Sequence, residues 1–171
     1  SVRDGRAMAL LLMDLERFKE VNDTLGHKHG DQLLRQVGQR LRAALFSPDT
    51  GARLGGDEFG ILLPRLAAAG DIAIVCKKIL AVLEKPIVVA DIPVAVETSI
   101  GVALAPGHAD NADNLMQQAD MAMYRAKKSG GGYVVYAPEH NTYNPQRLAL
   151  MAELRDAIEH DQLLLHFQPM V

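Results

Sequence analysis

Residues 53–59 read Arg53-Leu54-Gly55-Gly56-Asp57-Glu58-Phe59, which sets two glycines directly before two carboxylates and an aromatic ring. Gly-Gly between extended segments predicts a β-hairpin, because both residues can adopt positive φ. A hairpin does not need two acids at its tip, and adjacent carboxylates repel each other unless a cation or water lies between them. The turn is therefore expected to face either bulk water or a metal-bound phosphate ester.

Apolar patterning on both sides of this hairpin predicts alternating strands and helices. A buried strand over 8–13 ends at Asp14, and period-two alternation predicts an eleven-residue strand over 94–104. Further elements are expected as helices over 29–45, 72–83 and 115–126 and a short strand over 133–136. The predicted fold class is α/β (α+β), with a central mixed, largely antiparallel sheet flanked by helices. The hairpin excludes an all-parallel sheet.

Composition narrows the classes of function. The chain has 171 residues, 49% of them hydrophobic, which suits one globular domain with a fragment of a second. A formal net charge of −3 gives no basic footprint for nucleic acid. No apolar run is long enough for a transmembrane helix, so membrane contact is not expected from this segment. The single cysteine, Cys76, lies on an apolar helical stripe and is expected in the core, which fits a reducing, cytoplasmic location.

The composition changes after Pro138. Residues 139–145 are polar and predict a linker, an apolar stripe predicts a helix over 148–158, and residues 163–167 begin a strand. The predicted domains are therefore 1–137 and a truncated second segment over 138–171.

Several ordered blocks carry a family resemblance. Over about residues 7 to 137 the chain resembles the GGDEF family, the diguanylate cyclases, through the blocks at 14–19 (DLERFK), 22–27 (NDTLGH), 30–31 (GD), 55–59 (GGDEF), 99–103 (SIGVA) and 119–127 (ADMAMYRAK). Residues 146–171 resemble the opening of an EAL phosphodiesterase domain, so the parent protein is expected to be a GGDEF–EAL tandem. The resemblance also implies similarity to nucleotide cyclase and polymerase palm folds.

The resemblance implies a reaction in which two GTP molecules condense to cyclic di-GMP and two pyrophosphates. It places Mg²⁺ or Mn²⁺ on the carboxylates of Asp14 and Asp57 and the carbonyl of Leu15, a hard-oxygen set that suits these ions. Asp57 is also the family's general base for the 3′-hydroxyl, although a metal-bound carboxylate is a weak base and metal activation can do that work. Glu58 would ligate a second metal.

The resemblance also assigns the substrate contacts. Asn22 and Asp31 would read guanine, whose N1 and N2 hydrogens a carboxylate can accept, and His27 would lie nearby. The remaining contacts would come from backbone groups near Phe18 and Lys19 for the terminal phosphates, from the turn glycines Gly55 and Gly56, and from the charge of Lys127. Because one pocket holds one GTP, two domains would meet as a homodimer, at least transiently.

Each of these residues also has a plain structural reading. Asp14 could simply end a strand, and Asp31 could be a helix N-terminal acid favoured by the helix dipole. His27 and His29 could form part of a zinc site, although no further ligand spacing accompanies them. Lys127 could be a solvated lysine at a helix end.

The chain departs from the family pattern in three places. Many relatives carry an Arg-x-x-Asp inhibitory product site, and here Phe46 replaces the arginine while Asp49 is kept. A phenyl ring cannot replace a guanidinium that grips phosphate, so weak or absent product inhibition is expected. Gly131 stands where many relatives have an arginine, which predicts one triphosphate contact fewer. The chain also begins past the family's usual N-terminal helix, which predicts reduced activity.

The leading interpretation is a Mg²⁺-dependent diguanylate cyclase domain, favoured by the intact Asp57-Glu58 pair. The alternative is a catalytically weak GTP-binding module that regulates the attached phosphodiesterase, favoured by Gly131 and the EAL opening. A third option is another palm-like nucleotidyltransferase, against which the Asn22 and Asp31 pair argues.

Overall fold

The computed structural model describes residues 7–66, 70–140, 153, 156–160 and 162. The chain divides into two compact units, 1–140 and 141–171. Residues 156–159 are helical, whereas the rest of the predicted 148–158 helix, apart from Glu153, and the predicted strand over 163–167 lie outside the described residues. The boundary after residue 137 stays a prediction. Within the described part of the chain, no helix combines the length and apolarity needed to cross a membrane.

The first unit alternates strands and helices much as the patterning predicts. Its elements are β1 (Met8–Leu15), α1 (Phe18–Leu25), α2 (His27–Ala44), β2 (Thr50–Gly55), β3 (Glu58–Leu63), α3 (Asp71–Glu84), β4 (Ile87–Val89), β5 (Ile92–Val94), β6 (Thr98–Ala105), α4 (Ala112–Lys128), β7 (Gly132–Val135) and the 3-10 helix η2 (Pro138–His140).

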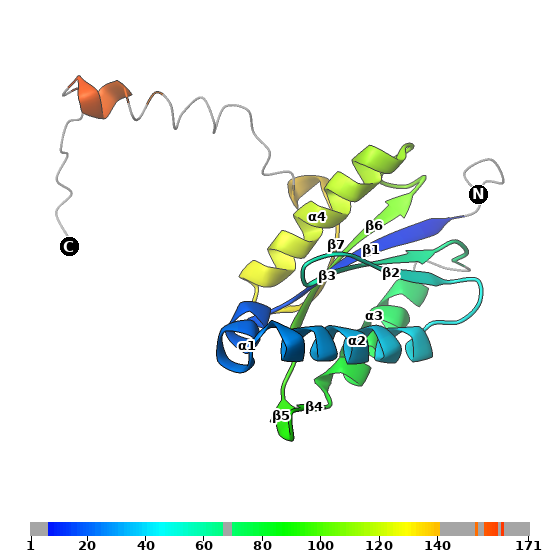
Figure 1. Ribbon diagram of the computed structural model, residues 1–171. Coiled ribbons are helices and arrows are strands. Elements are labelled where there is room, and N and C mark those ends of the chain that lie inside the picture. The colour runs from blue at the N-terminus through cyan, green and yellow to red at the C-terminus, as the bar shows by residue number, and fades with distance from the viewer. Residues whose placement is uncertain (1–6, 67–69, 141–152, 154–155, 161, 163–171) are drawn as a thin grey trace, which may run out of the picture. The chain divides into compact units, whose positions relative to one another are not determined.

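Five strands form the main sheet, in the order β2-β3-β1-β6-β7. β1 is antiparallel to both β3 and β6, β2 is antiparallel to β3, and only the β6–β7 pair is parallel. The predicted mixed, largely antiparallel sheet flanked by helices is confirmed. In Figure 1, α2 and α3 cover one face of the sheet and α4 covers the other.

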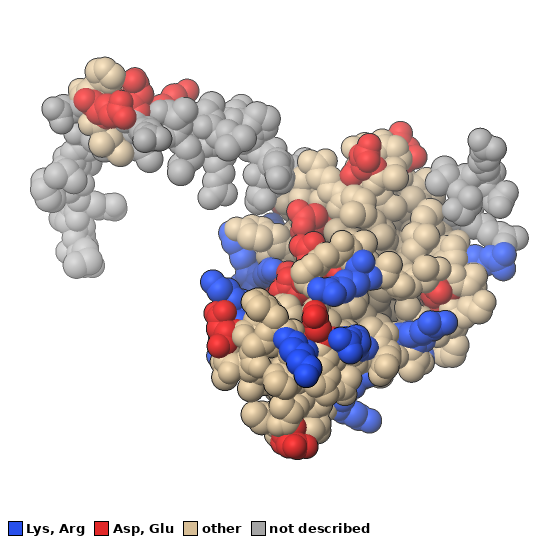
Figure 2. Space-filling model, viewed as in Figure 1, with Lys and Arg blue, Asp and Glu red and all other residues tan. Residues whose placement is uncertain are grey.

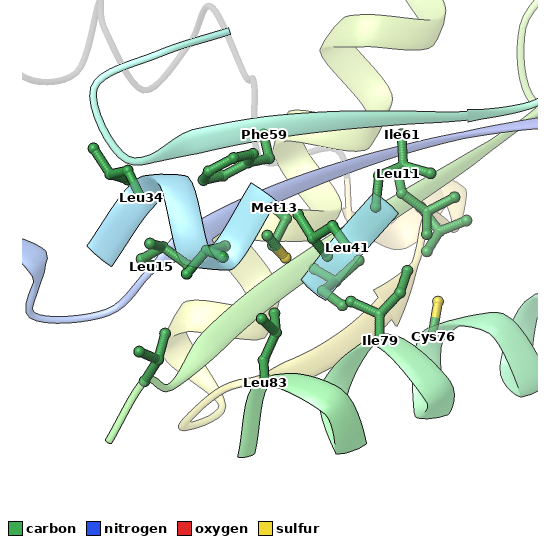
Figure 3. Packing of buried hydrophobic residues seen from close by; sticks show 14 of the residues in the cluster. Leu11, Met13, Leu15, Leu34, Leu41, Phe59, Ile61, Cys76, Ile79 and Leu83 are labelled. Carbon is green, nitrogen blue, oxygen red and sulfur yellow. The ribbon is translucent and has the colours of Figure 1, made fainter. Parts of the chain in front are cut away.

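Two hydrophobic clusters hold these layers together. The larger lies between the sheet and α2 with α3, and Figure 3 shows its side chains interdigitating, among them Leu11, Met13, Phe59, Ile79 and Cys76. Each such side chain stabilises the fold by about 1.5–3 kcal/mol when fully buried. The smaller cluster lies under α4 and includes Leu12, Ala103 and Leu115. Burial of alternate β1 residues on opposite faces follows from the period of two along a strand.

The predicted eleven-residue strand over 94–104 is wrong. β5 ends at Val94 and pairs with β4 in a separate two-stranded sheet, and β6 begins at Thr98. The alternating apolar pattern runs through the break because Val96, in the segment between the two strands, is also buried in the core. Helices cover both faces of β6, so all its residues except Leu104 are buried.

Candidate functional site

The C-terminal end of β1 carries the first of the predicted site residues. Asp14 lies directly opposite Glu58 of β3 and Ser99 of β6. Residues in direct register point to the same face of a sheet, so these three side chains form a row across it. Asp14 is 7% exposed and Ser99 fully buried, whereas Glu58 is exposed.

The signature hairpin ends beside this row. Its turn consists of Gly56 and Asp57, with Gly55 paired to Glu58. Gly56 has φ +51°, a left-handed conformation that glycine adopts without strain. Arg53 Nε donates to the Gly56 carbonyl at 2.9 Å, which closes the turn. The predicted hairpin is confirmed, and Asp57 is half-buried at its tip.

Lys127, near the end of α4, forms an ion pair with Asp14. Its Nζ lies 2.8 Å from Asp14 Oδ1. Burial raises the pKa of the Asp14 carboxyl, the hydrogen bond and charge of Lys127 oppose that rise, and the charges of Asp57 and Glu16 add to it. Desolvation acts to lower the pKa of Lys127, but Asp14, Glu16 and Asp57 raise it overall. Three carboxylates therefore act on one lysine, and the reading of Lys127 as merely solvated is wrong.

Glu16 is the member of this cluster that sequence reasoning missed. The buried Ser99 Oγ donates to Glu16 Oε1 at 2.5 Å, and the Glu16 amide donates to the Glu97 carbonyl at 2.8 Å. These bonds fix the chain immediately after Leu15. The available signal was the i, i+2 spacing of Asp14 and Glu16, which places both on one face of an extended segment.

The donor set suits a hard divalent cation that keeps part of its own ligand shell. Among the residues described, no group of three or more His, Cys, Asp and Glu side chains is arranged to hold a metal. Mg²⁺, however, is commonly bound by one or two carboxylates, with water and phosphate oxygens completing its shell. Asp14 and Asp57 supply such a pair, and Lys127 already places a cation against Asp14.

A groove of about 990 Å³ runs along α2 and the outer hairpin strand. Asp31 lies in it with Arg35 and Arg42 of α2 and Arg53 of β2. In Figure 2, Lys and Arg side chains lie over this face, with acidic side chains between them. The groove therefore combines two carboxylates, of Asp31 and Asp49, with several cations that suit an anionic ligand.

Asn22 and Asp31 belong to neighbouring helices. A Cβ placed on Gly30 would lie 2.0 Å from Asn22 Oδ1, so the Asn22 amide rests directly against the residue before Asp31. α2 begins at His27 rather than at 29, which puts Asp31 in its second turn. The first turn of α2 contains no acidic residue, so Asp31 lies beyond the turn in which the helix dipole acts most strongly. His27 is exposed at the start of α2.

His29 has a local hydrogen-bond partner. Its Nδ1 lies 2.6 Å from the Leu25 carbonyl oxygen and donates to it. The bond joins the end of α1 to the first turn of α2.

The turn between β1 and α1 presents backbone N–H groups. Arg17 takes a left-handed conformation, with φ 60°, and α1 begins at Phe18 with no side-chain cap. The guanidinium of Arg17 is paired with Glu20 at 2.7 Å and is exposed at the surface. Phe18 is half-buried and Lys19 exposed. Uncapped first-turn amides attract anions.

The segment that matches the family's product site forms a closed turn. The Asp49 carboxylate accepts from the Phe46 amide at 3.3 Å, and the Asp49 amide donates to the Phe46 carbonyl at 2.6 Å. Phe46 is 70% exposed, with Lys78 Nζ 3.8 Å from its ring centroid. The hydrogen bonds of Asp49 thus close the turn in which it lies.

Gly131 closes the C-terminus of α4. Its amide donates to the Ala126 carbonyl at 3.0 Å, and its φ is +95°. A side chain at this position would be strained, because L-residues rarely adopt that conformation. Glycine at this position therefore allows the loop beside Lys127 to form. It also lacks the positive charge of the arginine that many relatives carry here.

The chain resembles known proteins in both fold and sequence. A crystal structure of the GGDEF domain of TpbB from Pseudomonas aeruginosa superposes with TM-score 0.76 at 41% identity, covering 80% of this chain and 88% of that one. The five-stranded sheet with its acidic hairpin thus has the fold of GGDEF cyclase domains. The family described as "Diguanylate cyclase, GGDEF domain" matches residues 1–132, and the chain belongs to it.

Two curated relatives extend beyond this chain. It is 42% identical over 172 residues to the bifunctional diguanylate cyclase/cyclic di-GMP phosphodiesterase MucR of Pseudomonas aeruginosa, covering 100% of this chain and 25% of that protein. It is 37% identical over 169 residues to the cyclic di-GMP phosphodiesterase PdeR of Escherichia coli, covering 98% of this chain and 25% of that protein. The chain thus spans a quarter of the length of these relatives.

Proposed function

We propose that residues 1–137 form a diguanylate cyclase domain that condenses two GTP molecules to cyclic di-GMP and two pyrophosphates. The observation that carries this proposal is the 2.8 Å ion pair of Asp14 with Lys127, on which the charges of Glu16 and Asp57 also act, beside the signature hairpin. The family to which the chain belongs supports it. Because the substrate is GTP, the proposed location is the cytoplasm.

The chain's own residues bind and orient the nucleotide in this proposal. Asn22 and Asp31 accept the guanine edge, with His27 nearby. The uncapped amides at Phe18 and Lys19 receive the terminal phosphates. The glycines of the hairpin turn let the α-phosphate approach the backbone, and Lys127 neutralises charge on the triphosphate.

In each of the two steps, a 3′-hydroxyl oxygen forms a bond to the α-phosphorus of the other GTP and the bond to pyrophosphate breaks. Such transfers depend on positioning and charge neutralisation. Asp14, Asp57 and the Leu15 carbonyl would hold Mg²⁺ or Mn²⁺, with Glu58 available to a second ion. The bound cation would supply charge neutralisation and make the hydroxyl more acidic. Asp57 stands next to the site as the acceptor of that proton.

Two copies must meet, because each pocket holds one GTP and the product joins two. We therefore propose a two-fold homodimer that forms at least transiently. The closed Phe46–Asp49 turn supports the proposal that cyclic di-GMP does not inhibit this domain strongly through that segment.

The test is product formation by the full chain with GTP and Mg²⁺. We expect Asp57→Ala to reduce synthesis of cyclic di-GMP by at least about 10²-fold, as for loss of one preorganised charged group. Asp49→Ala is the matched control, since Asp49 directly precedes β2 and forms its hydrogen bonds with Phe46 in its own turn, and it should retain activity. Equal activity of Asp57→Ala and the unmodified chain would refute the proposal.

A second candidate is a GTP-binding module that regulates an attached phosphodiesterase. Gly131 favours it, as does the likeness to PdeR, and it requires that residues 138–171 open an EAL domain, which we also propose. Tight GTP binding without turnover by the unmodified chain would select this reading.

A further inference from the structure

The ion pair between Lys127 and Asp14 is unusual for a site proposed to hold a divalent cation. Lys127 Nζ lies 2.8 Å from Asp14 Oδ1, and the Asp14 side chain is only 9% exposed. The residue proposed as a metal ligand is thus already paired with a cation. Lys127 is more accessible, with 36% of its side chain exposed, so its ammonium has room to move toward solvent or a ligand.

Electrostatic repulsion makes the Lys127 ammonium and a divalent cation compete for Asp14. The charges of Glu16 and Asp57 act on both members of the pair. Without Lys127, three neighbouring carboxylates would repel one another. With both Lys127 and a divalent ion against Asp14, the two cations would repel each other at close range, where little solvent screens them.

We propose that Lys127 is a built-in counter-ion, which neutralises Asp14 in the nucleotide-free domain and leaves it when a divalent cation binds. The released ammonium then becomes available to the phosphates. This inference rests on the proposed role of Asp14 as a metal ligand. It implies that metal and triphosphate promote each other's binding, because the metal frees Lys127 and the phosphates give it a new partner.

Lys128 provides a matched control. It is the next residue in the same helix, is exposed, and lies with its Nζ 4.6 Å from the Tyr124 ring centroid. Lys128→Met removes the same charge as Lys127→Met without touching Asp14.

The first experiment titrates Mn²⁺ into the nucleotide-free full chain and follows free Mn²⁺ by electron paramagnetic resonance. We expect Lys127→Met to bind Mn²⁺ up to about fivefold more tightly than the unmodified chain, the equivalent of losing one competing ion pair. Lys128→Met should stay close to the unmodified chain. Unchanged, weaker or unmeasurable binding by Lys127→Met would overturn the inference, as would an equal gain in Lys128→Met.

A second measurement separates displacement from simple repulsion. Side-chain ¹⁵N spectra of lysine-labelled protein, with the Lys127 signal assigned through its loss in Lys127→Met, are recorded as Mg²⁺ is added without nucleotide. Displacement moves the Lys127 signal and leaves that of Lys128 in place. A Lys127 signal that stays fixed while metal binds would refute displacement.

These results are independent of the proposed reaction. Product formation without displacement refutes only the counter-ion role. Displacement without product formation refutes only the cyclase assignment.

Discussion

At the residue scale, Gly30 provides space for a neighbouring side chain. Its Cα lies so close to Asn22 that an added Cβ would meet Oδ1 at 2.0 Å and the Phe18 ring at 3.2 Å. Gly38 lies further along α2. A Cβ added there would make only an ordinary 3.9 Å contact with the Phe59 ring. An alanine at Gly30 would therefore displace Asn22, a proposed guanine contact, whereas an alanine at Gly38 would not.

We expect Gly30→Ala to weaken GTP binding about tenfold, because displacing Asn22 removes one hydrogen bond to the base. Calorimetry with a non-hydrolysable GTP analogue measures this, and Gly38→Ala should bind as the unmodified chain does. Equal affinity of both variants would show that Asn22 does not contact the ligand.

His108 couples stability to pH. Its Nδ1 accepts from the Leu104 amide at 3.1 Å, and its ring packs edge-on against Tyr136 at 5.4 Å between centroids. Burial lowers the pKa of His108 below its ordinary value. The stabilisation is therefore complete above that ordinary value and is lost as the pH falls from there through the lowered pKa of the native state, because the unfolded chain takes up the proton more readily.

We expect His108→Asn to flatten this dependence, since an asparagine oxygen can accept the same bond without titrating. Urea unfolding at about pH 7.5 and about pH 5.5 brackets the ordinary histidine pKa. The free energy of unfolding should fall more on acidification in the unmodified chain than in His108→Asn. Equal falls would contradict the assignment.

At the element scale, the packing of α4 against the sheet determines the position of Lys127. A Cβ on Gly101 of β6 would come within 2.0 Å of the Ala119 carbonyl oxygen and 2.1 Å of the Met123 amide nitrogen. These are backbone atoms, which cannot move without the helix. Close approach of helix and strand thus requires glycine at this point.

Gly101→Ala should therefore lower the free energy of unfolding by about 1–3 kcal/mol or more, the usual cost of overpacking. Urea denaturation measures the loss. Gly107→Ala is the control, because a Cβ there meets only Leu104 Cβ at 3.9 Å. A loss no larger than that of the control would mean that α4 does not pack this closely.

At the scale of the whole molecule, the larger core encloses the single cysteine. Cys76 is fully buried between α3 and the sheet, and burial raises the pKa of its thiol to about 12. A protonated, inaccessible thiol does not react, because thiolate is the nucleophile. Its modification therefore reports opening of the core.

We expect no rapid reaction of the native chain with a disulfide reagent at about pH 8, and full reaction in urea. The control is Ser47→Cys in a Cys76→Ser background, since Ser47 is exposed and should react at once. Fast stoichiometric labelling of native Cys76 would show that the core opens readily.

Much of this molecule follows from local sequence. The helices and the hairpin form because apolar residues recur at their periods and glycines allow the turn, and local interactions dominate both. The family blocks likewise placed Asp14, Asn22, Asp31 and Asp57 as candidates before any geometry was known.

Other features depend on residues far apart in the chain. The break between Val94 and Thr98 cannot be seen in the pattern, because Val96 in the connecting segment is buried and continues the apolar alternation. The contacts of Glu16 with Ser99 and of Lys127 with Asp14 join residues more than 80 positions apart. Only sheet register and the seating of α4 bring such groups together. Local patterning and the family blocks are therefore enough to predict most of the elements and the family. Which charges meet depends on the tertiary structure, because long-range packing sets the distances between them.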